Sequence, residues 1–348
     1  MASPACCPAR WRFVNTRTIA EPCRTSRSKA VFPNDDVFNL ARHHVVRLAA
    51  LRDWEWPTLV VAAAIYGGFM LLTWNWCDLP VGLAAPLGAV LIAWHGSLQH
   101  ETIHGHPTPF RRLNVLIGMP PLSLWLPYAL YRETHLGHHQ DSGQDLPDPI
   151  RDPESHYLHR GTLAAADRLQ LAVLRWHNTL GGRMTIGPAL LVGRCWLAEA
   201  RRVMASPRRR LLWLRHGLAL VPMLVWIVRI CRIPLGDYIA LVVYPSIALG
   251  LVRSFTEHRA APAPLDRTAV VEAGWFWSLL FLNNNLHVVH LRQPDLPWYR
   301  MPDAWRRLRG RIDLAPGMLF RGGYAEVFVR YLLTPVGPVE HPGFEEPA

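Results

Sequence analysis

Three short groups of histidines, spaced as on one face of a helix, are the residues of this sequence best suited to chemistry. Residues three or four positions apart on an α-helix share a face, with Cβ atoms about 5–6 Å apart. Neutral imidazole is a good ligand for iron and zinc, so each group is a candidate metal-ligating set. The three groups are His100 and His104; His135, His138 and His139; and His287 and His290.

An eighth histidine, His258, stands alone after the last long apolar segment. Eight imidazoles are too many for one metal ion, so the set predicts a centre with two. His95 and His106 flank the first group, and we expect them to pack or to support the ligands rather than to bind metal. The histidines without helical spacing are expected to be surface or ordinary core residues: His43, His44, His156, His159, His177, His216 and His341.

The first histidine group also has a rival interpretation. Residues 100–104 read His-Glu-Thr-Ile-His and match HExxH, the helical zinc motif in which the glutamate is a general base. A catalytic zinc ion takes three protein ligands, which would leave most of the other six spaced histidines unexplained. A two-iron centre accounts for all of them, with Glu101 supporting a ligand or serving as a polar anchor.

Long apolar segments precede the histidine groups and must position them. A spanning helix needs about 20 apolar residues, and four segments meet this requirement in two hairpins. Residues 113–130 are also apolar but contain Pro120, Pro121 and Pro127, which predicts a kinked or re-entrant hairpin. The four predicted spans are 57–76, 81–98, 211–230 and 235–252.

The charge pattern predicts which side of the membrane carries the histidines. The chain has 348 residues, is 50% hydrophobic and has a formal net charge of +11. The first hairpin turn has no basic residue, whereas Arg52, Arg111 and Arg112 lie near the hairpin ends, so the histidine side is predicted to be cytoplasmic. Arginines flank apolar segments instead of forming an aromatic-rich basic stripe, which argues against nucleic-acid binding. The six cysteines form no CxxC pair and predict neither a zinc site nor a disulfide framework.

The predicted domain organisation has three parts. Residues 1–35 are polar, lack a signal-peptide core and are expected to be disordered, a transit peptide or a later start of translation being the alternatives. Residues 36–310 are expected to form the membrane domain, which begins with a basic amphipathic helix at 36–53 and includes surface helices within 162–205. Residues 311–348 are expected to form a cytoplasmic tail.

The histidine groups, taken with the hairpins, resemble the integral-membrane fatty acid desaturases. That family carries three histidine boxes, HxxxH or HxxxxH, HxxHH and HxxHH, separated by membrane hairpins. Residues 100–104 match the first box, 135–139 the second, and 285–290 the start of the third. His258 resembles the family's ligand outside the boxes. The resemblance covers about residues 40–300, and the Pro-rich loop and tail are similar to those of bacterial members.

The resemblance implies an all-α membrane protein whose four transmembrane helices carry a cytoplasmic helical cap with the boxes. It implies two iron ions, O2 as co-substrate and introduction of a double bond into a fatty acyl chain. A related hydroxylase or ketolase acting on an alkane or carotenoid is the alternative. The implied metal ligands are His100, His104, His135, His138, His139, His258, His287 and His290.

The resemblance also implies partners and exposes one departure from the pattern. The implied partners are a membrane lipid or other acyl substrate and a separate electron donor of ferredoxin, rubredoxin or cytochrome b5 type, since no haem or flavin motif is present. The implied location is the bacterial inner membrane. The third box of the family ends in two adjacent histidines, but position 291 here is Leu. One ligand is therefore missing. The alternatives are that a neighbouring group such as one of Asn283–Asn285, or water, completes the shell, that one iron binds weakly, or that the chain is a catalytically impaired relative.

Overall fold

The structure is a computed structural model that describes residues 54–140, 166–257, 267–312 and 314–340. Several sequence predictions fall outside these ranges: the N-terminal extension, the amphipathic helix at 36–53 and the placement of His258. Five further histidines are also outside the described residues, namely His43, His44, His156, His159 and His341.

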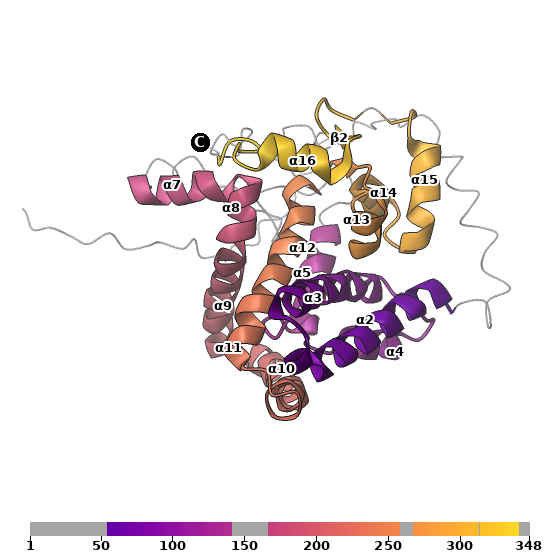
Figure 1. Cartoon of the computed structure of the whole chain (residues 1–348). Helices are drawn as coiled ribbons and strands as arrows, with labels where there is room; N and C mark the ends of the chain where they lie inside the picture. Colours follow the sequence, from indigo (N-terminus) through magenta and orange to yellow (C-terminus); the bar gives the residue numbers. More distant parts are fainter. Residues whose placement is uncertain (1–53, 141–165, 258–266, 313, 341–348) are drawn as a thin grey trace, which may run out of the picture. The chain divides into compact units, whose positions relative to one another are not determined.

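Four helical segments of the described chain are long and apolar enough to cross a membrane (Figure 1). Together with an almost complete absence of strands in the described ranges, they confirm the predicted all-α membrane fold. α2 packs against α3, and α3 packs against α12. The first two spans are α2 (Trp56–Trp74) and α3 (Val81–Ile103); the third is α10 (Pro207–Leu224) with the π-helical η2 (Val225–Ile230); the fourth is α11 (Leu235–Asp237), the π-helical η3 (Tyr238–Val243) and α12 (Tyr244–Glu257).

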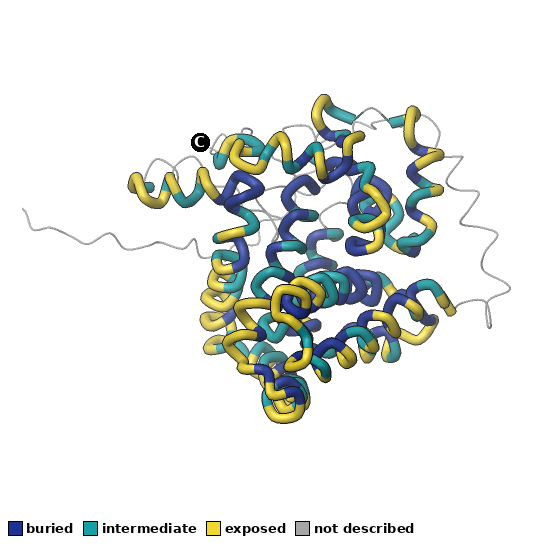
Figure 2. Tube along the Cα trace, viewed as in Figure 1, coloured by how far each residue is buried: buried dark blue, intermediate teal, exposed yellow. Residues whose placement is uncertain are grey.

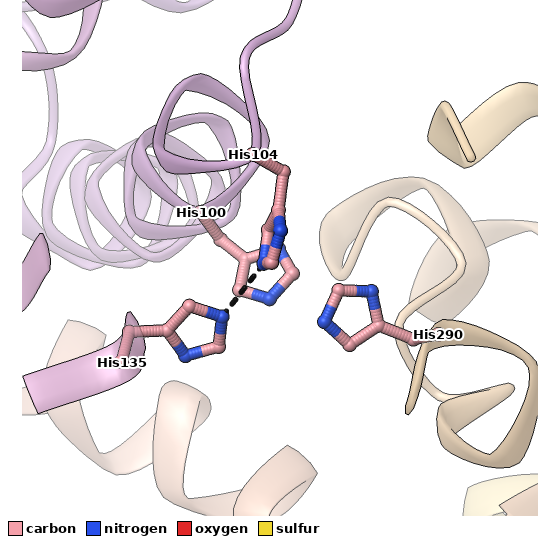
Figure 3. Close-up of side chains that lie close together, drawn as sticks. All are labelled: His100, His104, His135 and His290. Carbon is pink, nitrogen blue, oxygen red and sulfur yellow. Dashed lines mark hydrogen bonds between the residues drawn. The ribbon is translucent and has the colours of Figure 1, made fainter. Parts of the chain in front are cut away.

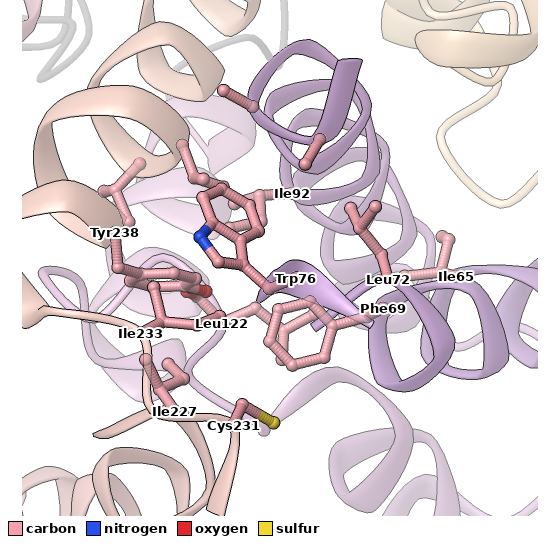
Figure 4. Close-up of a cluster of buried hydrophobic side chains, with 14 of the residues drawn as sticks. Ile65, Phe69, Leu72, Trp76, Ile92, Leu122, Ile227, Cys231, Ile233 and Tyr238 are labelled. Atoms are coloured by element: carbon pink, nitrogen blue, oxygen red, sulfur yellow. The ribbon is translucent and has the colours of Figure 1, made fainter. Parts of the chain in front are cut away.

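One apolar core joins both hairpins (Figure 4). Ile65 and Phe69 of α2 lie in it with Ile92 of α3. The second hairpin contributes Ile227 of η2 and Ile233 of its turn. Figure 2 shows that exposed positions line the outer faces of the helices and buried positions their inner faces. The outer surface of α10 is apolar, since its Leu214 and Leu218 are exposed large apolar side chains. Such apolar exposure is stable in a bilayer and costly in water.

The segment predicted as a kinked hairpin forms two helices joined by a proline-rich turn. α4 (Arg111–Gly118) ends just before Pro120, and α5 (Tyr128–Gln140) begins just after Pro127. The turn is bonded to the second hairpin, because the hydroxyl of Tyr238 donates to the Leu122 carbonyl at 2.6 Å. Proline cannot donate a helical hydrogen bond, so one helix cannot continue through Pro120 and Pro121, and the segment divides into α4 and α5.

The remaining elements complete the region that carries the histidines. The chain is mostly helical over 168–205, as predicted, and the place of these helices on the cytoplasmic surface stays a prediction. After α12, strand β1 pairs in parallel with β2, so residues beyond 310 are tied to the rest of the chain; the predicted domain boundaries remain predictions. The elements are η1 (Trp76–Asp78), α7 (Arg168–His177), α8 (Leu180–Thr185), α9 (Gly187–Ala205), β1 (Val270–Val271), α13 (Trp275–Leu280), α14 (His287–Arg292), η5 (Trp298–Arg300), α15 (Met301–Leu308), β2 (Leu319–Phe320) and α16 (Gly323–Tyr331).

Gly118, the last residue of α4, provides a test of how closely α4 packs on α3. A Cβ atom there would clash with Thr102 Oγ1 and lie 2.6 Å from Tyr128 Cε2. We expect Gly118→Ala to lower the free energy of unfolding by about 1–3 kcal/mol. Gly96→Ala is the matched control, because a Cβ at Gly96 meets no atom within 4 Å and alanine favours a helix interior. Equal thermal unfolding midpoints for the two variants in detergent would contradict the packing.

Candidate metal centre

Four predicted ligands from three helices meet in one place (Figure 3). His100 lies in the last turn of α3 and His104 caps that helix; His135 comes from α5 and His290 from α14. One ring nitrogen from each lies within 4.8 Å of those of the other three. Three of the four side chains are buried, and that of His104 is half-buried.

The second set of histidines surrounds this group. His139 Nε2 lies 3.1 Å from His135 Nε2 and 3.1 Å from His290 Nε2. His138 and His287 face each other with ring centroids 6.3 Å apart, and the His287 ring lies 5.6 Å from that of His290. All the predicted ligands that the structure describes therefore form one continuous cluster.

The cluster is an environment for uncharged imidazole. Burial, followed by the neighbouring His135 and His139, lowers the pKa of His104 to about 2. Burial, followed by His104, His139 and His135, holds the pKa of His290 well below its usual value. Uncharged rings have a free lone pair for a metal ion, which is the form a metal ligand requires.

The donor set fits a metal ion that prefers nitrogen ligands. His100 Nε2 is buried, and no hydrogen-bond partner for it exists within the described ranges. A buried nitrogen without a partner is costly, and a bound cation would remove that cost. The four grouped donors are all imidazoles, a set that suits iron, zinc, copper or nickel rather than magnesium or calcium.

Two buried glutamates lie beside the cluster instead of within it. Glu257 ends α12, and its Oε1 lies 3.6 Å from His287 Nδ1 and 3.2 Å from Arg253 Nε. Asn284 Oδ1 is 3.3 Å from the same His287 nitrogen. A carboxylate near the far nitrogen of a metal-binding histidine fixes the ring and raises its basicity. Histidine spacing does not point to Glu257; its signal in the sequence is that of a lone acid at the end of an apolar span, four residues after Arg253.

Glu101, the central residue of the HExxH match, is also buried. Its Oε2 accepts a hydrogen bond from the backbone N–H of Trp298 at 3.2 Å, and its Oε1 lies 3.9 Å from His100 Nδ1. These contacts agree with the expectation of a supporting residue or polar anchor.

The other described histidines have separate partners. His95 Nε2 lies 3.1 Å from the Tyr66 hydroxyl, and His216 Nε2 donates to the carbonyl of Leu124 at 2.9 Å. His106 Nδ1 lies 2.6 Å from Glu55 Oε1. Burial alone would lower the pKa of His106, but the hydrogen bond to Glu55 and the nearby carboxylates outweigh it and raise that pKa. These residues match the expected packing and supporting roles.

A membrane-helix frame that brings histidines from three helices into one buried cluster defines a candidate membrane metalloprotein. A model of the fatty acid desaturase family matches residues 75–321, a range that includes all the histidine groups and both hairpins from the first turn onward. The chain therefore belongs to the fatty acid desaturase family. Membership supports an oxidoreductase, and the family is known for di-iron centres, lipid substrates and external electron donors. Comparison with curated proteins found no match.

The lowered histidine pKa values predict an acid-sensitive metal-free protein. Below about pH 6.5 the unfolded chain binds protons that folded His104 and His290 do not, so stability falls as pH falls. Burial, followed by nearby arginines, also lowers the pKa of His177 to about 3 and adds to the effect, while the raised pKa of His106 opposes it. Each lowered histidine contributes up to about 1.4 kcal/mol per pH unit.

The measurement is the thermal unfolding midpoint of chelator-treated protein in detergent from pH 7 to pH 5. We expect a steady decrease, with a shallower slope for His104→Asn. A midpoint that is constant over this range would contradict the buried, uncharged cluster.

Proposed function

We propose that this chain is a di-iron, O2-dependent oxidoreductase that introduces a double bond into a fatty acyl chain. One observation carries the proposal: ring nitrogens of His100, His104, His135 and His290 lie within 4.8 Å of one another in a chain of the fatty acid desaturase family. Zinc hydrolysis through HExxH is less well supported, because Glu101 is engaged by a backbone amide and further histidines surround the first pair.

The proposed ligands are the eight histidines that the sequence singled out. His138, His139 and His287 would serve the second ion beside the four grouped imidazoles, and their ring contacts support this. His258 is proposed on its position in the chain, supported by the contact of the preceding residue, Glu257, with His287. Leu291 cannot bind a metal, so the second ion is proposed to be held more weakly than the first.

The residues of the chain would bind, orient and exclude water. When bound, the two irons supply the redox chemistry with which O2 attacks an unactivated C–H bond. In the balanced reaction O2 takes up four electrons and four protons and leaves as two waters. The acyl chain gives two electrons and two protons as its double bond forms, the donor gives two electrons, and solvent gives two protons. Burial of His100, His135 and His290 keeps water from the site, and the apolar spans keep an acyl chain within reach.

The proposed setting is a bacterial inner membrane with the histidines facing the cytoplasm. The distribution of arginines around the spans supports this orientation. A separate ferredoxin, rubredoxin or cytochrome b5 type protein would then supply electrons from the cytoplasm.

A hydroxylase or ketolase reaction is the second candidate, since related membrane enzymes share the histidine pattern. Mass spectrometry of the product separates the two, because desaturation removes two hydrogens and hydroxylation adds an oxygen. A metal-free relative is the third candidate, and Leu291 is the observation that favours it.

Removal of one proposed ligand of the second ion tests the metal centre and the lipid reaction together. We expect purified protein to contain about two irons per chain and His138→Ala to contain at most one, as measured by elemental analysis. Cells expressing the unaltered chain should gain an unsaturated acyl product that cells expressing His138→Ala lack. His216→Gln, at a buried histidine bonded to a backbone carbonyl outside the cluster, is the control and should retain both irons. A folded protein without bound iron would overturn the proposal.

Restoration of the missing ligand tests the proposed weakness at position 291. We expect Leu291→His to raise the affinity for the second iron about tenfold or more. Loss of a residue that only hydrogen-bonds to a ligand already costs about 10–100-fold in metal affinity, so a restored ligand should have at least a comparable effect. The measurement is the iron remaining per chain during titration with a chelator, and Leu291→Gln is the control for polarity alone. An unchanged titration curve would show that the site does not need a ligand from this position.

A further inference from the structure

Trp298 has three polar groups, two on its backbone and one on its indole ring, and each is hydrogen-bonded to a different part of the molecule. The backbone N–H donates to Glu101 Oε2 at 3.2 Å, and the backbone carbonyl accepts from Asn283 Nδ2 at 3.0 Å. The indole Nε1–H donates to Thr58 Oγ1 at 3.1 Å. The ring itself packs against the apolar core that joins the two hairpins.

The three partners belong to three separate elements. Glu101 follows His100 in the last turn of α3, Asn283 lies in the turn before α14, and Thr58 lies in the first turn of α2. Glu101, Asn283 and Thr58 are all buried, so leaving their polar groups without a partner would be costly.

The turn that holds Asn283 has an unusual backbone. Leu282 and Asn283 both have positive φ, 47° and 57°. Asparagine tolerates this left-handed conformation but leucine does so only at a cost of about 1–2 kcal/mol. The conformation persists because tertiary contacts hold it: Leu282 is buried in the core, and Asn283 reaches the Trp298 carbonyl. His287 and His290 follow directly on α14.

The contacts of Trp298 extend to the other side of the first histidine pair. The hydroxyl of Thr58 donates to Glu55 Oε2 at 3.4 Å, and Glu55 Oε1 lies 2.6 Å from His106 Nδ1. Trp298 therefore contacts residues connected with both ends of the segment from Glu101 to His106.

We propose that Trp298 is a positioning residue: the hydrogen bond from its indole to Thr58 holds in place the backbone groups that bind Glu101 and Asn283, and so fixes the first histidine group relative to the third. The first and third histidine groups are far apart in sequence, so noncovalent contacts alone set the distance between His100 and His290. Misplacement of ligands by about 1 Å is enough to weaken a metal site. The role in metal binding rests on the proposed function, and the role in ordering the histidine segments does not.

The chain contains a matched control for the indole hydrogen bond. Trp226 Nε1 donates to Thr73 Oγ1 at 3.0 Å, so it makes the same tryptophan–threonine bond to the last turn of α2, with the tryptophan likewise half-buried and the threonine likewise buried. The Trp226 bond is at the opposite end of α2 from Thr58, and the Trp226 ring packs against Trp74 and the apolar core. Trp298→Phe and Thr58→Val remove one bond, and Trp226→Phe and Thr73→Val remove the other.

The first experiment measures hydrogen–deuterium exchange in the metal-free full chain in detergent. We expect Trp298→Phe and Thr58→Val to speed amide exchange about threefold to tenfold in peptides covering both 99–106 and 283–292. This factor corresponds to the loss of one hydrogen bond. Trp226→Phe and Thr73→Val should leave those peptides unchanged and affect only the other end of α2. Unchanged exchange in either histidine segment of Trp298→Phe would overturn the positioning role.

The second experiment titrates the same variants with Co2+ and records its visible absorption spectrum, which reports ligand geometry. We expect weaker binding, by about threefold to tenfold, and an altered spectrum for Trp298→Phe but not for Trp226→Phe. Glu101→Gln, which retains an oxygen acceptor, should bind Co2+ better than Glu101→Leu. A wild-type spectrum and affinity in Trp298→Phe would overturn its role in metal binding.

The two experiments separate this inference from the proposed function. If the unaltered chain bound no Co2+, the di-iron proposal would fail, and the exchange result would still decide whether Trp298 orders the histidine segments. If the chain bound metal and Trp298→Phe matched Trp226→Phe in both experiments, the di-iron proposal would stand and the positioning role would be wrong.

Discussion

Burial of uncharged imidazole rings from α3, α5 and α14 in one cluster is the constraint on which the rest of this structure depends. A charged histidine in such surroundings would be expensive, and a neutral one still carries a donor and an acceptor that need partners. The rings of the cluster meet this need largely through one another, as the 2.8 Å contact between His104 Nε2 and His135 Nε2 illustrates. The cluster is thus polar inside and depends on an apolar frame around it to exclude water.

Buried carboxylates at the edge of the cluster connect it to this frame. Glu101 and Glu257 lie near the histidines, yet each is also bound elsewhere, to the Trp298 amide and to Arg253 respectively. Each acid therefore joins a histidine segment to a second part of the chain, and neither belongs to the group of four histidines whose ring nitrogens lie together. The metal chemistry and the stability of the fold consequently share the same residues, so substitutions at these acids are expected to affect both.

Local sequence patterns predicted the parts of the structure that depend on local periodicity. Apolar length predicted the four spans. Spacing singled out seven histidines of the described residues before their contacts were known, and four of them form the group that could hold a metal ion. Trp298 and Asn283 gave no such signal, because their roles come from partners far away in sequence. The β1–β2 pair was also missed, since two-residue strands are too short to show alternation. The left-handed conformation of Leu282 runs against local preference and is imposed by tertiary contacts.

The exposed surface of α10 has a consequence for how this sequence can change. Only 17% of the most apolar window of the Pro207–Ile230 span is buried within the protein, against 39–44% in the other three spans. The exposed residues of this span therefore need mainly to be apolar, and leucine, valine and isoleucine are equally suitable in contact with lipid tails. Leu214 and Leu218 are exposed, so we expect exchange for another aliphatic residue to be tolerated there. Ile65 and Ile92 are packed in the core, so a side chain of another shape would leave a cavity or a clash. In three spans, packing inside the protein therefore restricts many side chains. In the Pro207–Ile230 span, most positions need only be apolar.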